Sequence, residues 1–168
     1  SKARANEYRA SLDLLRRGRQ VKWLLDTNVL SESVRPNPDR KVLAWIAAHP
    51  GEELAISLIT VAELRAGVAA LGEIGRQRSF DAWMSAYVVP NFGERTLPIT
   101  LEILVDWIAL SRRLDARGRP KVAADLLIAS TARVHDLTLV TRNVRDFAQT
   151  GVIVYEPWSG KTHVMDKP

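Results

Sequence analysis

Short apolar runs alternate with longer segments of helical periodicity along most of this chain. Five runs have the length of buried strands and stop at polar or turn-forming residues; they cover residues 21–25, 54–57, 96–99, 137–141 and 152–155. The segments between them have the apolar spacing of amphipathic helices; they cover residues 28–33, 39–49, 59–71, 75–88, 100–115 and 122–135, with a helical turn at 143–148. This alternation is typical of an α/β fold with a mainly parallel sheet.

Two of the predicted helices allow a finer prediction about which side chains face the core. The helix that Thr100 would cap is expected to turn four apolar residues inward: Leu101, Leu104, Ile108 and Leu110. The helix at 75–88 carries large apolar residues at helical spacing, namely Phe80, Trp83, Met84 and Tyr87. We interpret these as core or dimer surface rather than as base-stacking groups.

The length of 168 residues corresponds to one domain with its own core. The core-forming pattern covers residues 21–156, and we expect residues 157–168 to be a tail with little core-forming potential. Residues 1–20 have the pattern of a basic helical extension, because an amphipathic stripe runs through 4–17. The strand that begins at Val21 has the character of a natural protein start, so we expect the extension to be an addition to the domain.

The composition excludes several kinds of site. The chain has no cysteine, which rules out disulfides and thiolate metal sites, and its three histidines lack the spacing of zinc ligands. No apolar stretch is long enough to span a bilayer, and the first residues are charged rather than signal-like. We therefore expect a cytoplasmic protein with no membrane partner.

The net charge of +5 is concentrated at the N-terminus. Residues 1–20 carry a net +4, so the rest of the chain is close to neutral. Within that remainder one basic run is opposed only by Asp115; it consists of Arg112, Arg113, Arg117, Arg119 and Lys121. These residues are candidates for RNA contacts, and the alternative is a solvated helix end with its flanking loop.

Four acidic residues occupy comparable places near the ends of the predicted strands. Asp26 follows the first strand directly, and Glu63 lies in the first two turns of the helix after the second strand. Asp125 lies in the first turn of the helix at 122–135, and Asp146 lies in the turn after the fourth strand. Ligands of open α/β sheets sit beyond the carboxyl ends of the strands, so these acids are candidates for one shared crevice.

Each acid also has a structural explanation of its own. Asp26 could be a turn residue, with Thr27 or Asn28 capping the next helix. Asp125 would complement the helix dipole, an effect of about 0.3–1 kcal/mol. Asn143 and Asp146 have the spacing of a capping box, and Glu63 could be a solvated helix acid.

The four acids together point to a metal site more strongly than any one of them does. Carboxylates that converge on one crevice repel one another and shift their pKa values. A divalent cation with oxygen ligands removes this conflict, and with no thiolate or histidine pair available the expected metal is Mg²⁺, or alternatively Mn²⁺. Such a site suits metal-assisted hydrolysis of a phosphodiester.

The segments around these acids have the order and spacing of a known family. They are Leu24–Glu32, Val61–Gly67, Ala124–Ala129 and Val140–Phe147. They resemble the PIN-domain ribonucleases, and among these the VapC-type and FitB-type toxins of bacterial toxin–antitoxin pairs, over about residues 21–156. The resemblance implies a PIN-like, Rossmann-like sheet of five mainly parallel strands flanked by helices, Mg²⁺-dependent cleavage of single-stranded RNA, a homodimer, and inhibition by a cognate antitoxin.

The resemblance also implies roles for individual residues. Asp26, Glu63 and Asp125 match the three acids of the family site, with Asp26 and Asp125 holding the metal directly or through water. Many relatives carry an acid where this chain has Asn143, so Asp146 would supply the outer carboxylate and Asn143 a neutral ligand or hydrogen bond. This difference leaves open whether one or two metals bind. Two polar positions match those that orient the first carboxylate, Asn28 and Thr141, and Arg142 joins the basic run as a candidate phosphate contact.

Three alternatives remain on the sequence alone. A haloacid-dehalogenase-like phosphatase also begins with an acid after its first strand, but it needs a second acid two residues later, where this chain has Asn28. A PIN-like fold used only for binding would employ the acids as caps. A nuclease directed at DNA could use the same site, because the metal acts on a phosphate and not on the 2′-hydroxyl.

Overall fold

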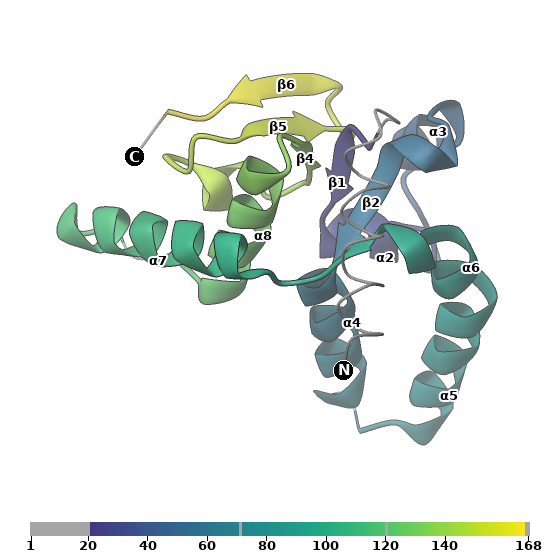
Figure 1. The fold of residues 1–168 in the computed structure, drawn as a ribbon. Coiled ribbons are helices and arrows are strands. Elements are labelled where there is room, and N and C mark those ends of the chain that lie inside the picture. Colours follow the sequence, from purple (N-terminus) through teal and green to yellow (C-terminus); the bar gives the residue numbers. More distant parts are fainter. Residues whose placement is uncertain (1–20, 71, 120, 167–168) are drawn as a thin grey trace.

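The computed structural model describes residues 21–70, 72–119 and 121–166, and the sheet at its centre has six strands in the order β3-β2-β1-β4-β5-β6 (Figure 1). The strands are β1 (Trp23–Leu25), β2 (Leu54–Ser57), β3 (Thr96–Leu97), β4 (Thr138–Val140), β5 (Ile153–Glu156) and β6 (Lys161–Val164). Neighbours from β3 to β5 run parallel, and β6 is antiparallel to β5. The predicted α/β class and the five predicted strands are confirmed. The predicted helix at 4–17 lies outside the described residues.

Helices cover both faces of this sheet (Figure 1). They are α2 (Thr27–Glu32), α3 (Arg40–Ala48), α4 (Leu58–Ala70), α5 (Ile74–Trp83), α6 (Val89–Phe92), α7 (Leu101–Ala116) and α8 (Ala123–Val134). Short turns complete the chain: η1 (Gly51–Glu53), η2 (Met84–Val88), η3 (Gly93–Arg95) and η4 (Val144–Phe147). No helix in the described ranges is long and apolar enough to cross a membrane.

The core is divided between the two faces of the sheet, because successive strand residues point to opposite sides. Leu24 faces a buried cluster that includes residues of α7, α8 and η4. Leu25 faces a second cluster, which includes residues of α2, α3, η2 and α6. The register places Leu25 opposite Ile56 of β2 and Val140 of β4. The carboxyl ends of β1, β2 and β4 therefore meet at one edge of the sheet.

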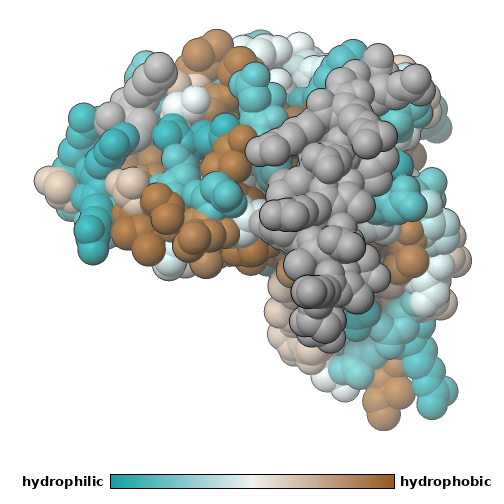
Figure 2. All heavy atoms as spheres, viewed as in Figure 1, coloured by the Kyte–Doolittle hydropathy of each residue, from teal (hydrophilic) through white to brown (hydrophobic). Residues whose placement is uncertain are grey.

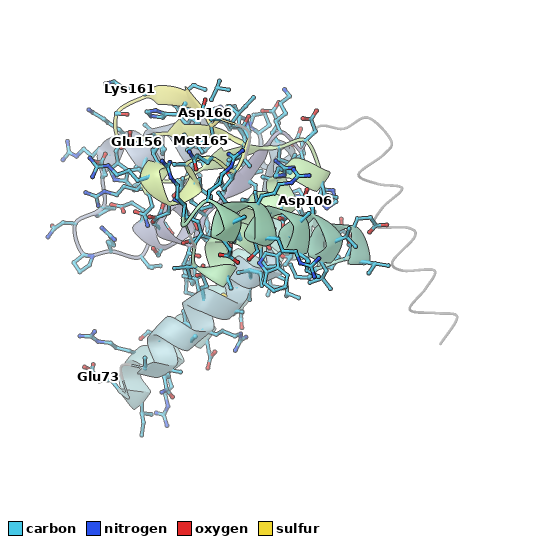
Figure 3. The ribbon with its side chains drawn as sticks, turned by 90° about the vertical axis from the view of Figure 1, so that its left-hand side faces the viewer. Glu73, Asp106, Glu156, Lys161, Met165 and Asp166 are labelled. Carbon is cyan, nitrogen blue, oxygen red and sulfur yellow. The ribbon has the colours of Figure 1, made fainter. Side chains whose placement is uncertain are left out.

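The sixth strand was not predicted, because residues 157–168 were expected to be a tail with little core-forming potential. Most side chains of β6 are exposed, so the strand shows no apolar pattern and is held to β5 by backbone pairing. The side chain of Met165 packs against the core cluster, and its backbone N–H donates to the Val152 carbonyl at 2.9 Å. Figure 3 shows Lys161 on this last strand and Met165 just after it, with Glu156 of β5 nearby. Residues beyond 156 therefore extend the sheet.

Helix α7 faces the core with different residues from those predicted. Leu101, Leu104 and Ile108 are 73%, 38% and 44% exposed, and of the four predicted residues Leu110 is buried. The buried side chains of α7 are Ile103, Leu110 and Leu114. The prediction failed because α7 is apolar on two faces, and spacing alone does not say which face packs against α8.

The helix predicted at 75–88 is interrupted. Helix α5 ends at Trp83 and continues as the π-helical turn η2 and then α6, which contains Pro90. Proline has no N–H to donate to the carbonyl four residues earlier, so a regular α-helical ladder cannot pass through this position. Met84 is buried and Phe80, Trp83 and Tyr87 pack against its cluster, so these residues belong to the core as predicted.

Candidate active site

Asp26 stands at the carboxyl end of β1 and is 5% exposed. It is itself the N-cap of α2, since its Oδ1 accepts from the Thr27 backbone N–H at 2.7 Å. Its Oδ2 accepts from Asn28 Nδ2 at 2.7 Å and from Thr141 Oγ1 at 2.6 Å. The expectation that Thr27 or Asn28 caps this helix was wrong, because both lie inside it. Capping uses only one oxygen of Asp26, so it does not exclude a second role.

Asn28 and Thr141 connect β1 to β4 around this carboxylate. Asn28 Nδ2 also lies 3.0 Å from Thr141 Oγ1, and Thr141 Oγ1 accepts from the Asn143 backbone N–H at 3.0 Å. Both side chains therefore fix the direction of the Asp26 carboxylate, which is the role that the resemblance implied for them. The backbone of Asn143 takes part in this network, and its side chain makes no capping hydrogen bond to η4. The capping-box interpretation of Asn143 and Asp146 is therefore wrong.

Glu63 lies on α4, the helix that follows β2, and β2 is the neighbour of β1 in the sheet. The Thr27 hydroxyl donates to Glu63 Oε2, which ties the start of α2 to α4. Thr27 was not among the predicted site residues, although its position directly after Asp26 was a usable signal. Thr27 thus links the carboxylates that follow β1 and β2.

Burial raises the pKa of Asp26 above its ordinary value. The hydrogen bonds from Thr141 and Thr27 act in the opposite direction, and the negative charge of Glu63 adds to the increase. A carboxylate with a raised pKa is held at a place where negative charge is unfavourable. Hydrogen bonds therefore hold the Asp26 carboxylate at a place where burial and the charge of Glu63 disfavour its ionised form.

Asp125 lies in the first turn of α8 and has its pKa raised to about 6. Burial is the largest cause, followed by the charges of Asp146, Asp26 and Glu63, and Lys121 partly opposes them. The charges of the other three predicted acids therefore all reach Asp125. The helix dipole alone would favour ionised Asp125 and lower its pKa, so burial and the neighbouring carboxylates together outweigh the dipole.

A pocket of about 390 Å³ opens beside Asp125 and Asp146. Arg119 and Lys121 of the predicted basic run also line it. Lys121 Nζ donates to the Arg145 carbonyl at 2.8 Å, which holds the ammonium near the pocket. Three further members of the run are exposed at the end of α7 and just beyond it: Arg112, Arg113 and Arg117. The structure therefore places part of the basic run at the acids and part of it away from them.

The acids are close enough to interact but do not form a ready-made metal cage. Within the described ranges, no three His, Cys, Asp or Glu side chains are grouped so that they could hold a metal ion directly. The donor set is carboxylate, hydroxyl and amide oxygen, which suits Mg²⁺ or Mn²⁺. A cation near Asp125 would also offset the repulsion that raises its pKa. Mg²⁺ keeps several waters and binds through one or two carboxylates, so the arrangement fits this ion.

The PIN domain is the family whose model matches this chain, over residues 23–153. The chain belongs to the PIN-domain family. The matched range holds all four acids, and the PIN domain occupies most of the chain's length.

The alignments of this chain with its known relatives span nearly the whole length of each relative. Toxin FitB of Neisseria gonorrhoeae is 37% identical over 135 residues, which are 80% of this chain and 97% of the relative. A VapC ribonuclease of Sinorhizobium fredii is 38% identical over 135 residues, 80% of this chain and 96% of the relative. The crystal structure of FitAcB from Neisseria gonorrhoeae contains a chain that aligns with a TM-score of 0.75 at 37% identity, covering 81% of this chain and 98% of that one.

Proposed function

We propose that this PIN domain is an Mg²⁺-dependent endoribonuclease that cleaves single-stranded RNA as the toxin of a toxin–antitoxin pair. The observation that carries the proposal is the gathering of four carboxylates at one edge of the sheet: Asp125 and Asp146 line one pocket, Thr27 ties Glu63 to the start of α2 beside Asp26, and the charges of the other three acids reach Asp125. Similarity to relatives named as a toxin and as a ribonuclease supports the same reading. A module used only for binding would have no need to hold four like charges within range of one another.

The chain's own residues divide the work of such a site. Asp26 and Asp125 would hold the metal, directly or through its waters, and Glu63 and Asp146 would complete the ligand shell. The metal, when bound, would lower the pKa of a water and neutralise charge on the scissile phosphate. Thr141 and Asn28 hold the Asp26 carboxylate in one orientation by donating to its Oδ2.

Arg119 and Lys121 are placed to hold the phosphates of the substrate strand. Both line the pocket that Asp125 and Asp146 share, so a phosphate there would lie beside the acids. Contacts of this kind release counterions and make binding weaker as salt rises. Glutamine in place of either residue should weaken RNA binding and reduce its salt dependence.

The nucleic acid that is cut decides between the proposed function and the DNA-directed alternative. Purified protein is incubated in Mg²⁺ with labelled single-stranded RNA and with DNA of the same sequence. We expect cleavage of RNA that EDTA abolishes, and intact DNA. Cleavage of DNA in preference to RNA would contradict the assignment of substrate while leaving the metal site in place.

Binding of Mg²⁺ should stabilise the chain strongly at about pH 7.5 and little at about pH 5. A carboxyl group whose folded pKa is raised stabilises the fold below its unfolded pKa of 3.8, and this contribution is lost as the pH rises through about 6. The ionised cluster at neutral pH is therefore the state that a cation relieves, whereas protons displace the cation at low pH. The measurement is the unfolding temperature with and without Mg²⁺ at both pH values.

The matched control is Asp125→Asn, which removes this titration. Burial lowers the pKa of His135, and that group changes stability with pH in the opposite sense. The comparison with Asp125→Asn isolates the carboxylate from this background. An equal gain from Mg²⁺ in both proteins would show that the ion binds elsewhere.

We place the expected homodimer on the apolar stripe of α7. Leu101, Leu104, Val105 and Ile108 are exposed and recur at helical spacing, and Figure 2 shows apolar side chains gathered over this helix. The Val105→Glu substitution puts a charge in the middle of the stripe, where Val105 is 59% exposed. We expect it to turn a dimer into a monomer in light scattering without unfolding it, whereas Val164→Glu on exposed β6 should leave the dimer intact.

An apolar groove between α4 and α5 is the surface that we assign to a cognate antitoxin. These two helices extend together from the body of the molecule (Figures 1 and 3). The groove has a volume of about 280 Å³. It is lined by Val34, Val68, Arg76, Ser79, Phe80 and Trp83. An amphipathic segment that lays its apolar side into such a groove is a common mode of recognition, so this is where we propose that the antitoxin docks.

A further inference from the structure

Arg142 and Trp158 form a pair at the carboxyl-end edge of the sheet, and neither is part of the carboxylate cluster. The guanidinium carbon of Arg142 lies over the Trp158 ring at 5.5 Å from its centroid. Cations within about 6 Å of a tryptophan centroid are attracted by the negative face of the ring. The Trp158 ring therefore favours one position of the Arg142 guanidinium.

The backbone fixes Arg142 in relation to the catalytic edge. Its backbone N–H donates to Asn28 Oδ1 at 3.1 Å, and Asn28 Nδ2 donates to Asp26 Oδ2 at 2.7 Å. One asparagine side chain thus joins Arg142 to the central carboxylate of the site. These two hydrogen bonds hold the backbone of Arg142 close to Asp26.

Trp158 is also held in place, by packing and by a hydrogen bond to its backbone. It follows β5 and the buried Pro157, its ring packs against the buried cluster of β1, β2 and β4, and its carbonyl oxygen accepts from Lys41 Nζ at 3.4 Å. Because the strand order is β1-β4-β5, residues that follow these strands succeed one another along the edge. Asp26, Arg142 and Trp158 therefore follow three successive strands at the same end of the sheet.

Arg142 is exposed, and within the described residues its guanidinium makes no ion pair. The guanidinium carbon lies over the Trp158 ring, and Arg142 is exposed, so a base can reach the guanidinium from solvent. Bases of single-stranded RNA stack on guanidinium planes as well as on aromatic rings. A guanidinium whose position is already fixed loses less conformational freedom when a base stacks on it.

Building on the proposed nuclease function, we infer that Arg142 stacks on one unpaired nucleobase beside the scissile phosphate and so sets a preference for an intact base at that position. Trp158 is the positioning residue that holds the guanidinium over its ring. This assignment differs from the phosphate contact that the sequence suggested for Arg142. The ammonium of Lys121 and the guanidinium of Arg119, on the pocket side, remain for the phosphates.

The test is an abasic scan of a labelled single-stranded RNA, read by fluorescence anisotropy on the full chain carrying Asp26→Asn to prevent cleavage. Each nucleotide in turn is replaced by an abasic ribose. We expect binding to weaken about tenfold at one position, as for the loss of one stacked base. In the Arg142→Lys variant, which keeps the charge but not the plane, this position should lose its effect. Trp158→Leu should behave like Arg142→Lys, and Trp158→Phe should restore most of the effect.

The matched control is Arg78→Lys, an exposed arginine on α5, which should keep the full abasic effect. If Arg142→Lys keeps it too, the stacking assignment is overturned. An abasic scan without any sensitive position, together with weaker binding and a smaller salt slope in Arg142→Gln, would make Arg142 a phosphate contact and also overturn it. RNA binding with the expected scan but no cleavage by the unsubstituted chain would refute the nuclease and leave the stacking site standing, and no RNA binding at all would refute both.

Discussion

Asp26→Asn should reduce RNA cleavage by at least about a hundredfold while leaving the fold intact. Residues that only orient a metal ligand change affinity or activity by about 10–100-fold, so replacing a ligand should have no smaller effect. The Asp26 carboxylate accepts from Thr27, Asn28 and Thr141, and an amide would turn one N–H toward these donors. The measurement is the initial rate of cleavage in Mg²⁺, with circular dichroism to show that the variant is folded.

Asp39→Asn is the matched control for this prediction. Asp39 is also an N-cap, for α3, and its side chain accepts from the Lys41 backbone N–H at 2.8 Å. Asparagine caps helices about as well as aspartate, so this variant should cleave at the normal rate. Full activity of Asp26→Asn would show that Asp26 does not belong to the active site.

Thr141→Val, which removes the hydroxyl donor to Asp26, should reduce the rate of RNA cleavage by about 10–100-fold.

Arg133→Met should destabilise the fold by about 2–3 kcal/mol. Arg133 on α8 makes a bidentate contact with Asp106 on α7, with Nε 3.0 Å from Oδ2 and Nη2 3.1 Å from Oδ1, and its Nη1 donates to the Thr150 carbonyl at 2.7 Å. Figure 3 labels Asp106 on α7. Hydrogen bonds to charged groups contribute about 1.5–3 kcal/mol, and the loss of one partner leaves the other half-buried charge unpaired. Chemical denaturation measures the difference.

The exposed ion pair of Arg76 with Glu73 provides the comparison. Its nitrogen and oxygen are 2.7 Å apart, but both side chains are well exposed. Exposed pairs contribute about 0–1 kcal/mol, so Arg76→Met should have a small effect. Equal destabilisation by Arg133→Met and Arg76→Met would show that the α7–α8 pair does not stabilise this packing.

The strands and the acids were predictable because both leave a local mark on the sequence. Buried parallel strands such as β2 are continuous apolar runs, and each acid lies directly beyond a strand or in the first turns of a helix. Strand β6 left no such mark, since its side chains are exposed and its backbone alone pairs with β5. The face that α7 buries was equally hidden, because the choice depends on the shape of α8 and not on spacing within α7.

The features of the site likewise divide into those that leave a local signal in the sequence and those that do not. The hydrogen bond from Thr27 to Glu63 and the contact of Arg142 with the Trp158 ring join residues that are 36 and 16 positions apart in the chain. Such contacts follow from the strand order β2-β1-β4-β5, which the sequence does not contain as a local signal. Trp158 followed a strand end as the acids do, but it lay in the segment that was assigned no structure.

The claim that the four acids work through a bound metal is tested most directly by removing and restoring the ion. Protein treated with EDTA is returned to buffer with increasing Mg²⁺, and cleavage of a labelled single-stranded RNA is followed for the unsubstituted chain and for Asp125→Asn. We predict no cleavage in EDTA, recovery of the unsubstituted chain as Mg²⁺ is added, and no recovery of Asp125→Asn at the same concentrations. Cleavage that continues undiminished in EDTA, or that Asp125→Asn recovers equally well, would contradict the metal site.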